Sequence, residues 1–197
     1  ATMQLGDLGA DVVKIEDPRQ GDESRRYGPP FVGGESAYFL SVNRNKRSCA
    51  IDLKSPAGRD AVLDLASAAD VVIENFRPGT LDKWGLGFDA LRARRSDIIL
   101  CSISGFGRTG ADAARPGYDL ILQGEAGVMD ITGDPMGPPT KVGTSIADLV
   151  TGLYASHSVL AALMRRSRTG EGGRVDVSML DAMASLLTFN ADRKSVV

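Results

Sequence analysis

The chain has 197 residues, of which 43% are hydrophobic and 24% are charged, a balance that argues against an intrinsically disordered protein. Its formal net charge of −2 disfavours a nucleic-acid partner that depends on a large basic surface. Two Cys and one His cannot close the four-ligand shell of a structural zinc site, so no metal is expected. No apolar run is identified as long enough for a membrane span, so no membrane partner is expected.

The first half of the chain alternates short apolar runs with helical patterns. The segment that reaches Gly9 is typical of the end of a helix closed by a glycine. Ser55 before Pro56 predicts the start of a helix that continues to Ala69, and a shorter helix is predicted at 88–94. Apolar, β-branched runs predict strands at residues 11–16, 48–53, 70–74 and 97–102. The last three runs are nearly continuous, as in strands buried on both faces.

The second half has fewer strands and longer helices. Glycine and proline predict loops at 105–117 and 131–143, and a basic, glycine-rich turn at 165–173. The remaining elements are a strand at 174–177 and helices at 118–129, 146–164 and about 179–188. The alternation of strands and helices along the whole chain predicts an α/β fold with a doubly wound, mostly parallel sheet.

Two polar turns are candidates for binding an anion. Residues 42–48 place amides and cations directly before a predicted strand, and residues 75–77 follow the next one. Ligands of open parallel sheets gather at the carboxyl ends of strands. There Arg77 can fork onto a phosphate and Phe76 can stack on a planar base, while Lys83 adds a cation. Charge alone favours solvated turns, so the phosphate interpretation depends on this position in the fold.

Asp148 is a candidate reactive acid. An acid in the first turn of a helix is stabilised by the helix dipole by about 0.3–1 kcal/mol, and most such acids have no further role. Asp148 also lies between Ile146 and Leu149, ahead of a helix that is apolar on most sides. A carboxylate there is expected to be partly desolvated and therefore reactive. The residues alone leave both interpretations open.

Residues 105–110 match the G-x-G-x-x-G pattern of dinucleotide-binding domains, and Asp130 lies near the expected place of the ribose-binding acid. That pattern requires a helix N-terminus against the pyrophosphate. No helix is predicted to begin at Gly110, and the pattern follows the fourth predicted strand rather than the first. A flexible loop over a site is the favoured interpretation, and an NAD-dependent dehydrogenase is the distant alternative.

Five segments, taken in order, resemble the family III (CaiB/BaiF-type) CoA-transferases. They are residues 5–16, 43–48, 74–79, 115–119 and 147–148. Each match is weak alone, but the ordered set covers nearly the whole chain and is specific. Among members of this family, the chain is most similar to those that use dicarboxylates such as succinate and glutarate.

The resemblance implies that Asp148 attacks the thioester of a donor acyl-CoA and later carries CoA as an aspartyl-CoA thioester, from which an acceptor acid takes it. Covalent catalysis of this kind divides one difficult acyl exchange into easier steps. Coenzyme A or acyl-CoA is then a substrate. The CoA-binding positions that the resemblance implies are Ile51, Asp52, Leu53, Lys54, Asn75, Phe76, Arg77, Lys83, Arg115 and Tyr118.

The resemblance further implies that residues 1–197 are part of a large, Rossmann-like CoA-binding domain. Members are roughly twice as long, as befits a two-domain chain. The chain is expected to begin within a helix, and residues from about 178 to 197 are expected to lead toward a small domain that is missing here. Full-length members form interlocked homodimers. The expected location is the cytoplasm, or the mitochondrial matrix in a eukaryote.

Two other functions related to CoA remain open. Racemases of this family carry histidine where this chain has Tyr118, and tyrosine, with a reference pKa of about 10, is a poor base at neutral pH. This difference favours transfer over α-methylacyl-CoA racemisation. A non-catalytic CoA-binding domain would keep the polar turns without using Asp148. Lys141, in the loop ahead of Asp148, is a candidate partner for the distal carboxylate of a dicarboxylic acid.

Overall fold

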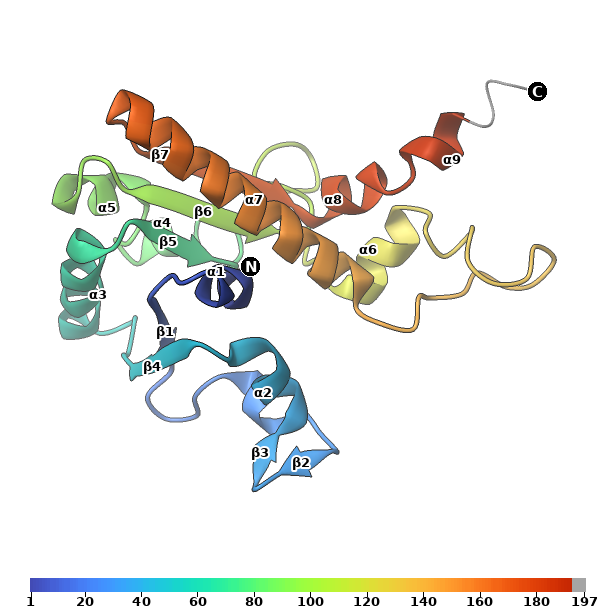
Figure 1. Cartoon of the computed structure of the whole chain (residues 1–197), viewed down its shortest axis with the longest axis horizontal. Coiled ribbons are helices and arrows are strands. Elements are labelled where there is room, and N and C mark those ends of the chain that lie inside the picture. Colours follow the sequence, from blue (N-terminus) through green and yellow to red (C-terminus); the bar gives the residue numbers. More distant parts are fainter. Residues whose placement is uncertain (193–197) are drawn as a thin grey trace.

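The computed structural model describes residues 1–192, which form a mixed α/β fold around a three-stranded parallel sheet (Figure 1). Its strands are β5 (Val71–Glu74), β6 (Ile99–Ser104) and β7 (Gly173–Ser178), and they lie in the spatial order β5-β6-β7. The three corresponding predicted strands and their parallel pairing are confirmed, with β6 displaced by two residues. In this register Glu74, Ser102 and Asp176 form one row near the carboxyl end of the sheet.

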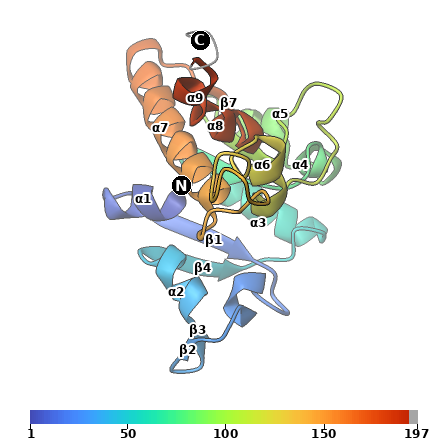
Figure 2. The same cartoon turned by 90° about the vertical axis from the view of Figure 1, so that its right-hand side faces the viewer.

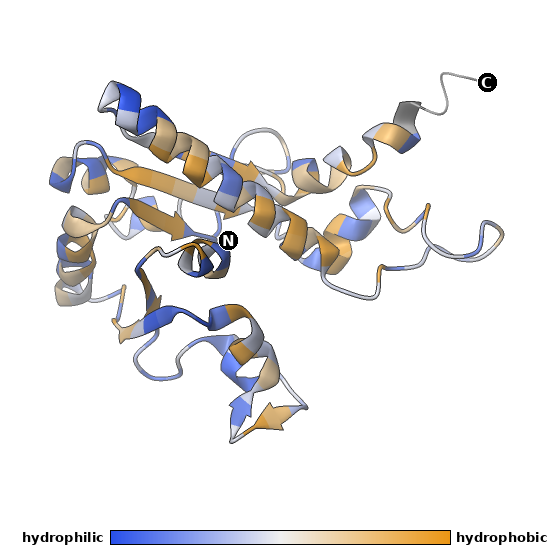
Figure 3. Cartoon of the chain, in the orientation of Figure 1, coloured by the Kyte–Doolittle hydropathy of each residue, from blue (hydrophilic) through white to orange (hydrophobic). Residues whose placement is uncertain are grey.

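A second parallel sheet has two strands, β1 (Val12–Glu16) and β4 (Lys46–Ala50). The predicted α/β fold with parallel strands is confirmed, but its strands are divided between two sheets, because β1 and β4 do not pair with β5, β6 or β7 (Figure 2). β4 also begins earlier than predicted, and it ends before residues 51–53. It is mostly exposed, since its first residues are charged and polar and cannot enter an apolar core. Figure 3 shows the contrast between this hydrophilic start and the hydrophobic β6.

Shorter elements connect and extend the two sheets. One pair, β2 (Phe31–Val32) and β3 (Glu35–Ser36), forms a small antiparallel hairpin. The others are α1 (Thr2–Asp7), η1 (Glu23–Arg26), α2 (Ala37–Asn43), α3 (Pro56–Ala68), α4 (Thr80–Lys83), α5 (Phe88–Arg94), α6 (Asp119–Glu125), α7 (Ile146–Thr169), α8 (Met179–Ser185) and α9 (Thr188–Asp192).

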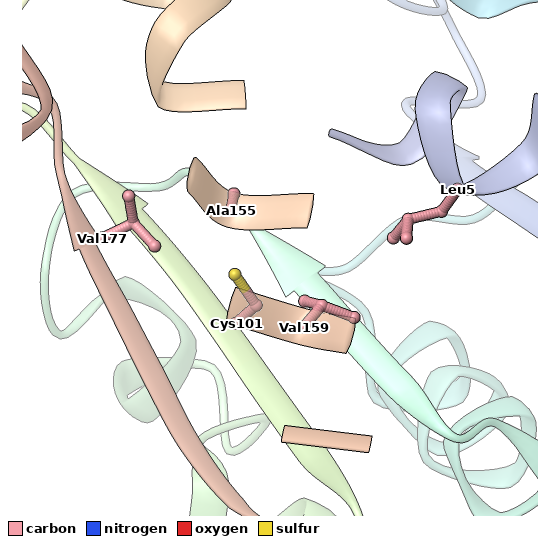
Figure 4. Packing of buried hydrophobic residues seen from close by; sticks show 5 residues of the cluster. All are labelled: Leu5, Cys101, Ala155, Val159 and Val177. Atoms are coloured by element: carbon pink, nitrogen blue, oxygen red, sulfur yellow. The ribbon is translucent and has the colours of Figure 1, made fainter. Parts of the chain in front are cut away.

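Helices cover both faces of the central sheet, as expected for a doubly wound fold. On one face, β6 and β7 pack against α7 and α1 (Figure 4). This cluster consists of Leu5, Cys101, Ala155, Val159 and Val177. On the other face, β6 packs against α3 and α5. That cluster consists of Ala66, Leu91, Ile98 and Leu100. Burial of these apolar side chains is the main force that holds the helices on the sheet.

The long helix α7 differs most from its prediction. It continues through residues 165–169, which were expected to form a turn, and ends where Gly170 takes a left-handed conformation with φ of 72°. Arg166 explains the extension, because its guanidinium reaches Asp70 at 2.7 Å and Asp97 at 3.6 Å. By length and composition alone α7 could cross a membrane, contrary to the expectation from sequence. One face of α7, with Ala155 and Val159, packs on the central sheet, whereas large apolar side chains such as Leu149 and Met164 on this helix are exposed.

The C-terminal segment forms two short helices, α8 and α9, rather than the one helix predicted at 179–188. α6 is also shorter than the predicted 118–129, and Gly127 (φ 82°) lies just beyond its end. Near the N-terminus, α1 ends before Gly9 (φ 99°), as predicted. The proposed link toward a small domain, residues 178–197, extends beyond the described residues, because 193–197 lie outside them.

Candidate active site

Asp148 lies in the first turn of α7. That turn sits at the carboxyl end of the central sheet, because Ala147 packs in one cluster with Met179 and Met183, which follow β7. The turn at 75–77 belongs to the same end of the sheet, since it follows β5. Strands β5 and β7 are separated by one strand, and so by about 10 Å. The fold therefore places the candidate acid and the candidate anion-binding turn at the same end of the central sheet.

The start of α7 is capped from another helix. Its own N-cap residue, Ser145, makes no capping hydrogen bond with its side chain. Instead the backbone N–H of Ala147 donates to Asp119 Oδ1 at 2.8 Å, and that of Asp148 donates to the same oxygen at 3.4 Å. A carboxylate is well suited to this place, because it satisfies free N–H groups at the positive end of the helix.

A buried amide holds Asp119 in place. Gln123 is 0% exposed, and its Nε2 donates to Asp119 Oδ2 at 2.7 Å and to the Thr144 carbonyl at 3.3 Å. Its Oε1 accepts the backbone N–H of Val142 at 2.8 Å. One side chain from α6 thus fixes both the cap and the segment that leads into α7, so the backbone at Asp148 is rigidly placed.

The carboxyl of Asp148 has a raised pKa. Partial removal of water by the surrounding protein is the larger cause, and the negative charge of Asp119 is the second. The side chain is nevertheless exposed in this chain, so the expected desolvation is partial. The pKa of Tyr38 in α2 is also raised, mainly by burial. The negative charges of Asp148 and Asp119 contribute to this increase. Asp148, Asp119 and Tyr38 therefore share one electrostatic environment.

The turn at 75–77 is exposed and shaped by the chain around it. The backbone N–H of Phe76 donates to Glu74 Oε2 at 2.8 Å. The Phe76 ring meets Trp84 edge-on at 5.2 Å and remains 38% exposed. Gly79 (φ 81°) then begins α4 in a left-handed conformation that other residues rarely adopt. The turn thus presents an aromatic face and the exposed side chain of Arg77 to solvent.

Three of the predicted CoA contacts are exposed cations. Within residues 1–192, Lys54, Arg77 and Lys83 form no ion pair with an acid. Lys54 lies in the turn at 51–54 that follows β4, where its backbone N–H donates to Asp52 Oδ1 at 3.0 Å. Residues 51–53 were predicted to belong to a strand, so their position in a turn is a correction. Residues 51–54 thus all lie just after the carboxyl end of β4, and ligands of such folds bind at the carboxyl ends of strands.

The cationic segment at 42–48 does not form the anion-binding turn that its composition suggested. Arg44 pairs with Asp7 and Arg47 pairs with Asp11, so both charges are already compensated. Lys46 lies in β4, where its Nζ donates to Asn43 Oδ1 at 2.8 Å and burial lowers its pKa. These side chains tie β4 to β1 and α1, and their role is structural.

The two remaining predicted CoA contacts lie beside the loop at 105–117. Arg115 pairs with Glu125 at 2.5 Å and with Asp112 at 3.3 Å, and its guanidinium lies 4.3 Å from the centre of the Phe106 ring. A CoA contact there would have to share this guanidinium. Tyr118 immediately precedes α6 and is 72% exposed. No helix begins at Gly110, so the segment lacks the geometry of a dinucleotide-binding loop.

Sequence reasoning missed Asp119 and Gln123 as site residues. The predicted helix at 118–129 places Asp119 at the start of its own helix, whereas in the structure it accepts the backbone N–H of Ala147, 28 residues later, and so caps α7. Gln123 has an ordinary place in an amphipathic pattern. The sequence offered no signal for this cap, because Ser145 is itself a favoured N-cap residue, and only the structure shows that its side chain makes no capping hydrogen bond.

Comparison with known proteins identifies the family. The sequence model of CoA-transferase family III matches residues 1–195. The chain is 47% identical over 188 residues to a succinyl-CoA:glutarate CoA-transferase of Mus musculus, which covers 95% of this chain and 43% of that protein. It is 50% identical over 194 residues to a succinyl-CoA:mesaconate CoA-transferase of Haloarcula hispanica, covering 94% and 48%.

A solved structure agrees with the fold described above. A CaiB/BaiF family protein from Brucella suis superposes with a TM-score of 0.95 at 46% identity, covering 98% of this chain and 52% of that one. The chain thus spans about half the length of the relatives that it matches. With a family match over almost every residue and the same α/β fold, this chain belongs to CoA-transferase family III.

Proposed function

We propose that the complete protein transfers CoA from an acyl-CoA donor to a dicarboxylic acid. The two curated relatives described above are both named for succinyl-CoA as donor and for a dicarboxylate as acceptor. Succinyl-CoA is therefore the first donor to test, and glutarate and mesaconate are the first acceptors. The reaction belongs in the cytoplasm, or in the mitochondrial matrix of a eukaryote, and the active form is an interlocked homodimer.

The carboxylate of Asp148 is the proposed nucleophile. It attacks the carbonyl carbon of the donor thioester. The C–S bond breaks, CoA departs as its thiolate, and a mixed anhydride forms between the donor acid and Asp148. The thiolate then attacks the Asp148 carbonyl carbon, which releases the donor carboxylate and leaves an aspartyl-CoA thioester. The acceptor carboxylate repeats both steps in reverse and regenerates Asp148. No proton is gained or lost overall.

The observation that carries this proposal is the way in which Asp148 is held. Its backbone is fixed by a cap from Asp119, and Gln123 holds that cap without occupying the Asp148 side chain. A nucleophile placed by a rigid backbone approaches a carbonyl with little loss of entropy. The raised pKa also makes the carboxylate a stronger nucleophile than an ordinary surface acid, as long as it remains ionised at neutral pH.

The exposed, unpaired cations support a nucleotide site. In the proposal, Arg77 and Lys83 bind CoA phosphates, Phe76 stacks on the adenine, and the segment at 51–54 with Lys54 lines the same nucleotide. Asn75, Arg115 and Tyr118 complete the proposed CoA contacts. Lys141, whose Nζ donates to the Val142 carbonyl at 3.2 Å, is proposed to face the distal carboxylate of the acceptor.

Mass spectrometry of the complete protein mixed with succinyl-CoA tests the central step. We expect a covalent CoA adduct on the peptide that contains Asp148, sensitive to hydroxylamine as a thioester should be. Asp148→Asn should abolish the adduct and the appearance of glutaryl-CoA when glutarate is added. Exchange of the α-proton for deuterium without any acyl transfer would instead identify a racemase. CoA binding without adduct or transfer would identify a non-catalytic domain.

A further inference from the structure

Apart from Arg115, the glycine-rich loop at 105–117 has no role in the proposed function, although it begins directly after β6 at the carboxyl end of the central sheet. Its two ends touch, since a Cβ added at Gly105 would lie 2.6 Å from the Gly117 Cα, and one added at Gly117 would lie 2.5 Å from the Gly105 Cα. Only glycine permits this approach. The contact between Gly105 and Gly117 therefore closes the loop at its base. The residues between them lie next to the carboxyl ends of the central strands.

Arg108 is the residue of this loop that reaches the sheet. Its guanidinium nitrogens lie 3.7 Å from Glu74 Oε1, 3.6 Å from Asp82 Oδ2 and 3.5 Å from Asp176 Oδ1. Glu74 and Asp176 belong to the row that crosses β5, β6 and β7, and Asp82 belongs to α4. One cation from the loop thus connects both outer strands of the sheet with the helix that follows the turn at 75–77.

Glu74 transmits this contact to the proposed nucleotide site. Its side chain is 6% exposed, and its second oxygen accepts the backbone N–H of Phe76 at 2.8 Å. Asp82 immediately precedes Lys83. Glu74 therefore holds the start of the segment that supplies Phe76, Arg77 and Lys83, and Asp82 belongs to the end of that segment. Arg108 forms an ion pair with each of the two acids.

The charges make the same residue necessary for a second reason. Without Arg108, three carboxylates would stand close together next to a turn that is proposed to bind a polyanion. A buried, unpaired carboxylate such as Glu74 is costly, and like charges beside a phosphate site weaken its binding. A guanidinium among the three acids removes much of this repulsion while its fixed fork geometry keeps them in register.

We propose that Arg108 is a positioning residue for CoA, which shapes and electrostatically protects the turn at 75–83 through Glu74 and Asp82 without touching the ligand. This inference rests on the proposed function, since it assumes that the turn binds the nucleotide part of CoA. It assigns the G-x-G-x-x-G segment a supporting role in CoA binding, in place of the phosphate-binding role that the same pattern has in dinucleotide enzymes.

Calorimetry of CoA binding and steady-state kinetics of the complete protein test the inference. We expect Arg108→Gln to raise the Kd for CoA and the KM for succinyl-CoA about tenfold, the order of one lost charge-assisted interaction, with kcat within about twofold. Arg94→Gln is the matched control, because Arg94 pairs with Asp64 on the surface between α3 and α5. It should leave all three constants unchanged.

Two further variants keep the test decisive. Arg108→Lys retains the charge but not the fork, so we expect a loss of affinity of about threefold; this variant replaces Arg108→Gln if the latter does not fold. Glu74→Gln in the Arg108→Gln background should weaken CoA much less than it does alone. Unchanged affinity in both Arg108 variants, or a loss confined to kcat, would overturn the inference. A wild-type protein that does not bind CoA would refute the proposed function itself.

Discussion

Replacement of Gln123 by leucine removes the clamp between α6 and the start of α7 while preserving the volume of the side chain. The native amide is fully buried and makes three hydrogen bonds, to Asp119, to Thr144 and from Val142. Leucine leaves the Val142 N–H unpaired, at about 1–3 kcal/mol, and removes a bond to a charged group, at about 1.5–3 kcal/mol. We expect a loss of about 3–5 kcal/mol, a large share of the stability of a domain.

Urea unfolding of Gln123→Leu and of the unchanged protein measures this loss directly. Hydrogen exchange localises it, and the backbone amides of Val142 and Ala147 should lose most of their protection. The rate of adduct formation on Asp148 should fall as well, since its backbone is no longer fixed. Gln20→Leu is the control, because Gln20 is exposed and accepts only from Arg26. A loss below about 1 kcal/mol with unchanged exchange at both amides would refute the role of the clamp.

Three further predictions concern charge and packing. The side chain of Glu16 is 3% exposed, and its pKa is lowered from 4.5 to about 2, chiefly by Arg25. The ionised carboxylate therefore stabilises the fold above pH 4.5, and this stabilisation is lost as the pH falls toward 2. By urea unfolding, Glu16→Gln should cost about 3 kcal/mol at pH 7 but only about 1.4 kcal/mol at pH 3, and a cost independent of pH would contradict this. Asp119→Asn removes a charge that raises the pKa of Asp148, so the acid limb of the kcat/KM profile should move to lower pH, and an unmoved limb would show that this charge does not reach Asp148. Gly117→Ala forces a Cβ to within 2.5 Å of the facing backbone and should lower the free energy of unfolding by about 1–3 kcal/mol, whereas Gly143→Ala, with nothing within 4 Å, should change it little.

Elements with local signals were predictable from the sequence. The helix α5 has the predicted bounds, and α3 begins at Pro56 behind its Ser55 cap, whose Oγ accepts the Gly58 N–H at 3.0 Å. The strands β1, β5 and β7 lie within about one residue of their predicted ranges. In each case the hydrophobic period and the residues at the ends agree, so neighbouring residues alone are enough to define the element.

Elements that depend on distant partners were not predictable in this way. β4 is charged where a buried strand was expected. Arg47 in this strand is balanced by Asp11, 36 residues earlier, and Arg44 just before it is balanced by Asp7 in α1, 37 residues earlier. The end of α7 is stabilised by Asp70 and Asp97, which lie far away in the sequence. The place of Asp148 in the first turn of a helix was predicted from the apolar pattern that follows it and is confirmed, whereas its cap from Asp119 has no local signature. Its catalytic role, implied by the family resemblance, stays a prediction.

The hydrogen bonds of Gln123 and Asp119 fix the start of α7 independently of the loop that joins α6 to α7. The backbone N–H of Thr140 donates to the Met129 carbonyl at 3.0 Å, so residues 130–139 form a loop. This hydrogen bond closes the loop before Val142, where the contacts of Gln123 begin. Changes in the length or sequence of residues 130–139 are therefore expected to leave the backbone at Asp148 in place. Substitutions confined to those ten positions should therefore keep the hydrogen bonds of Gln123 and Asp119, and with them the start of α7.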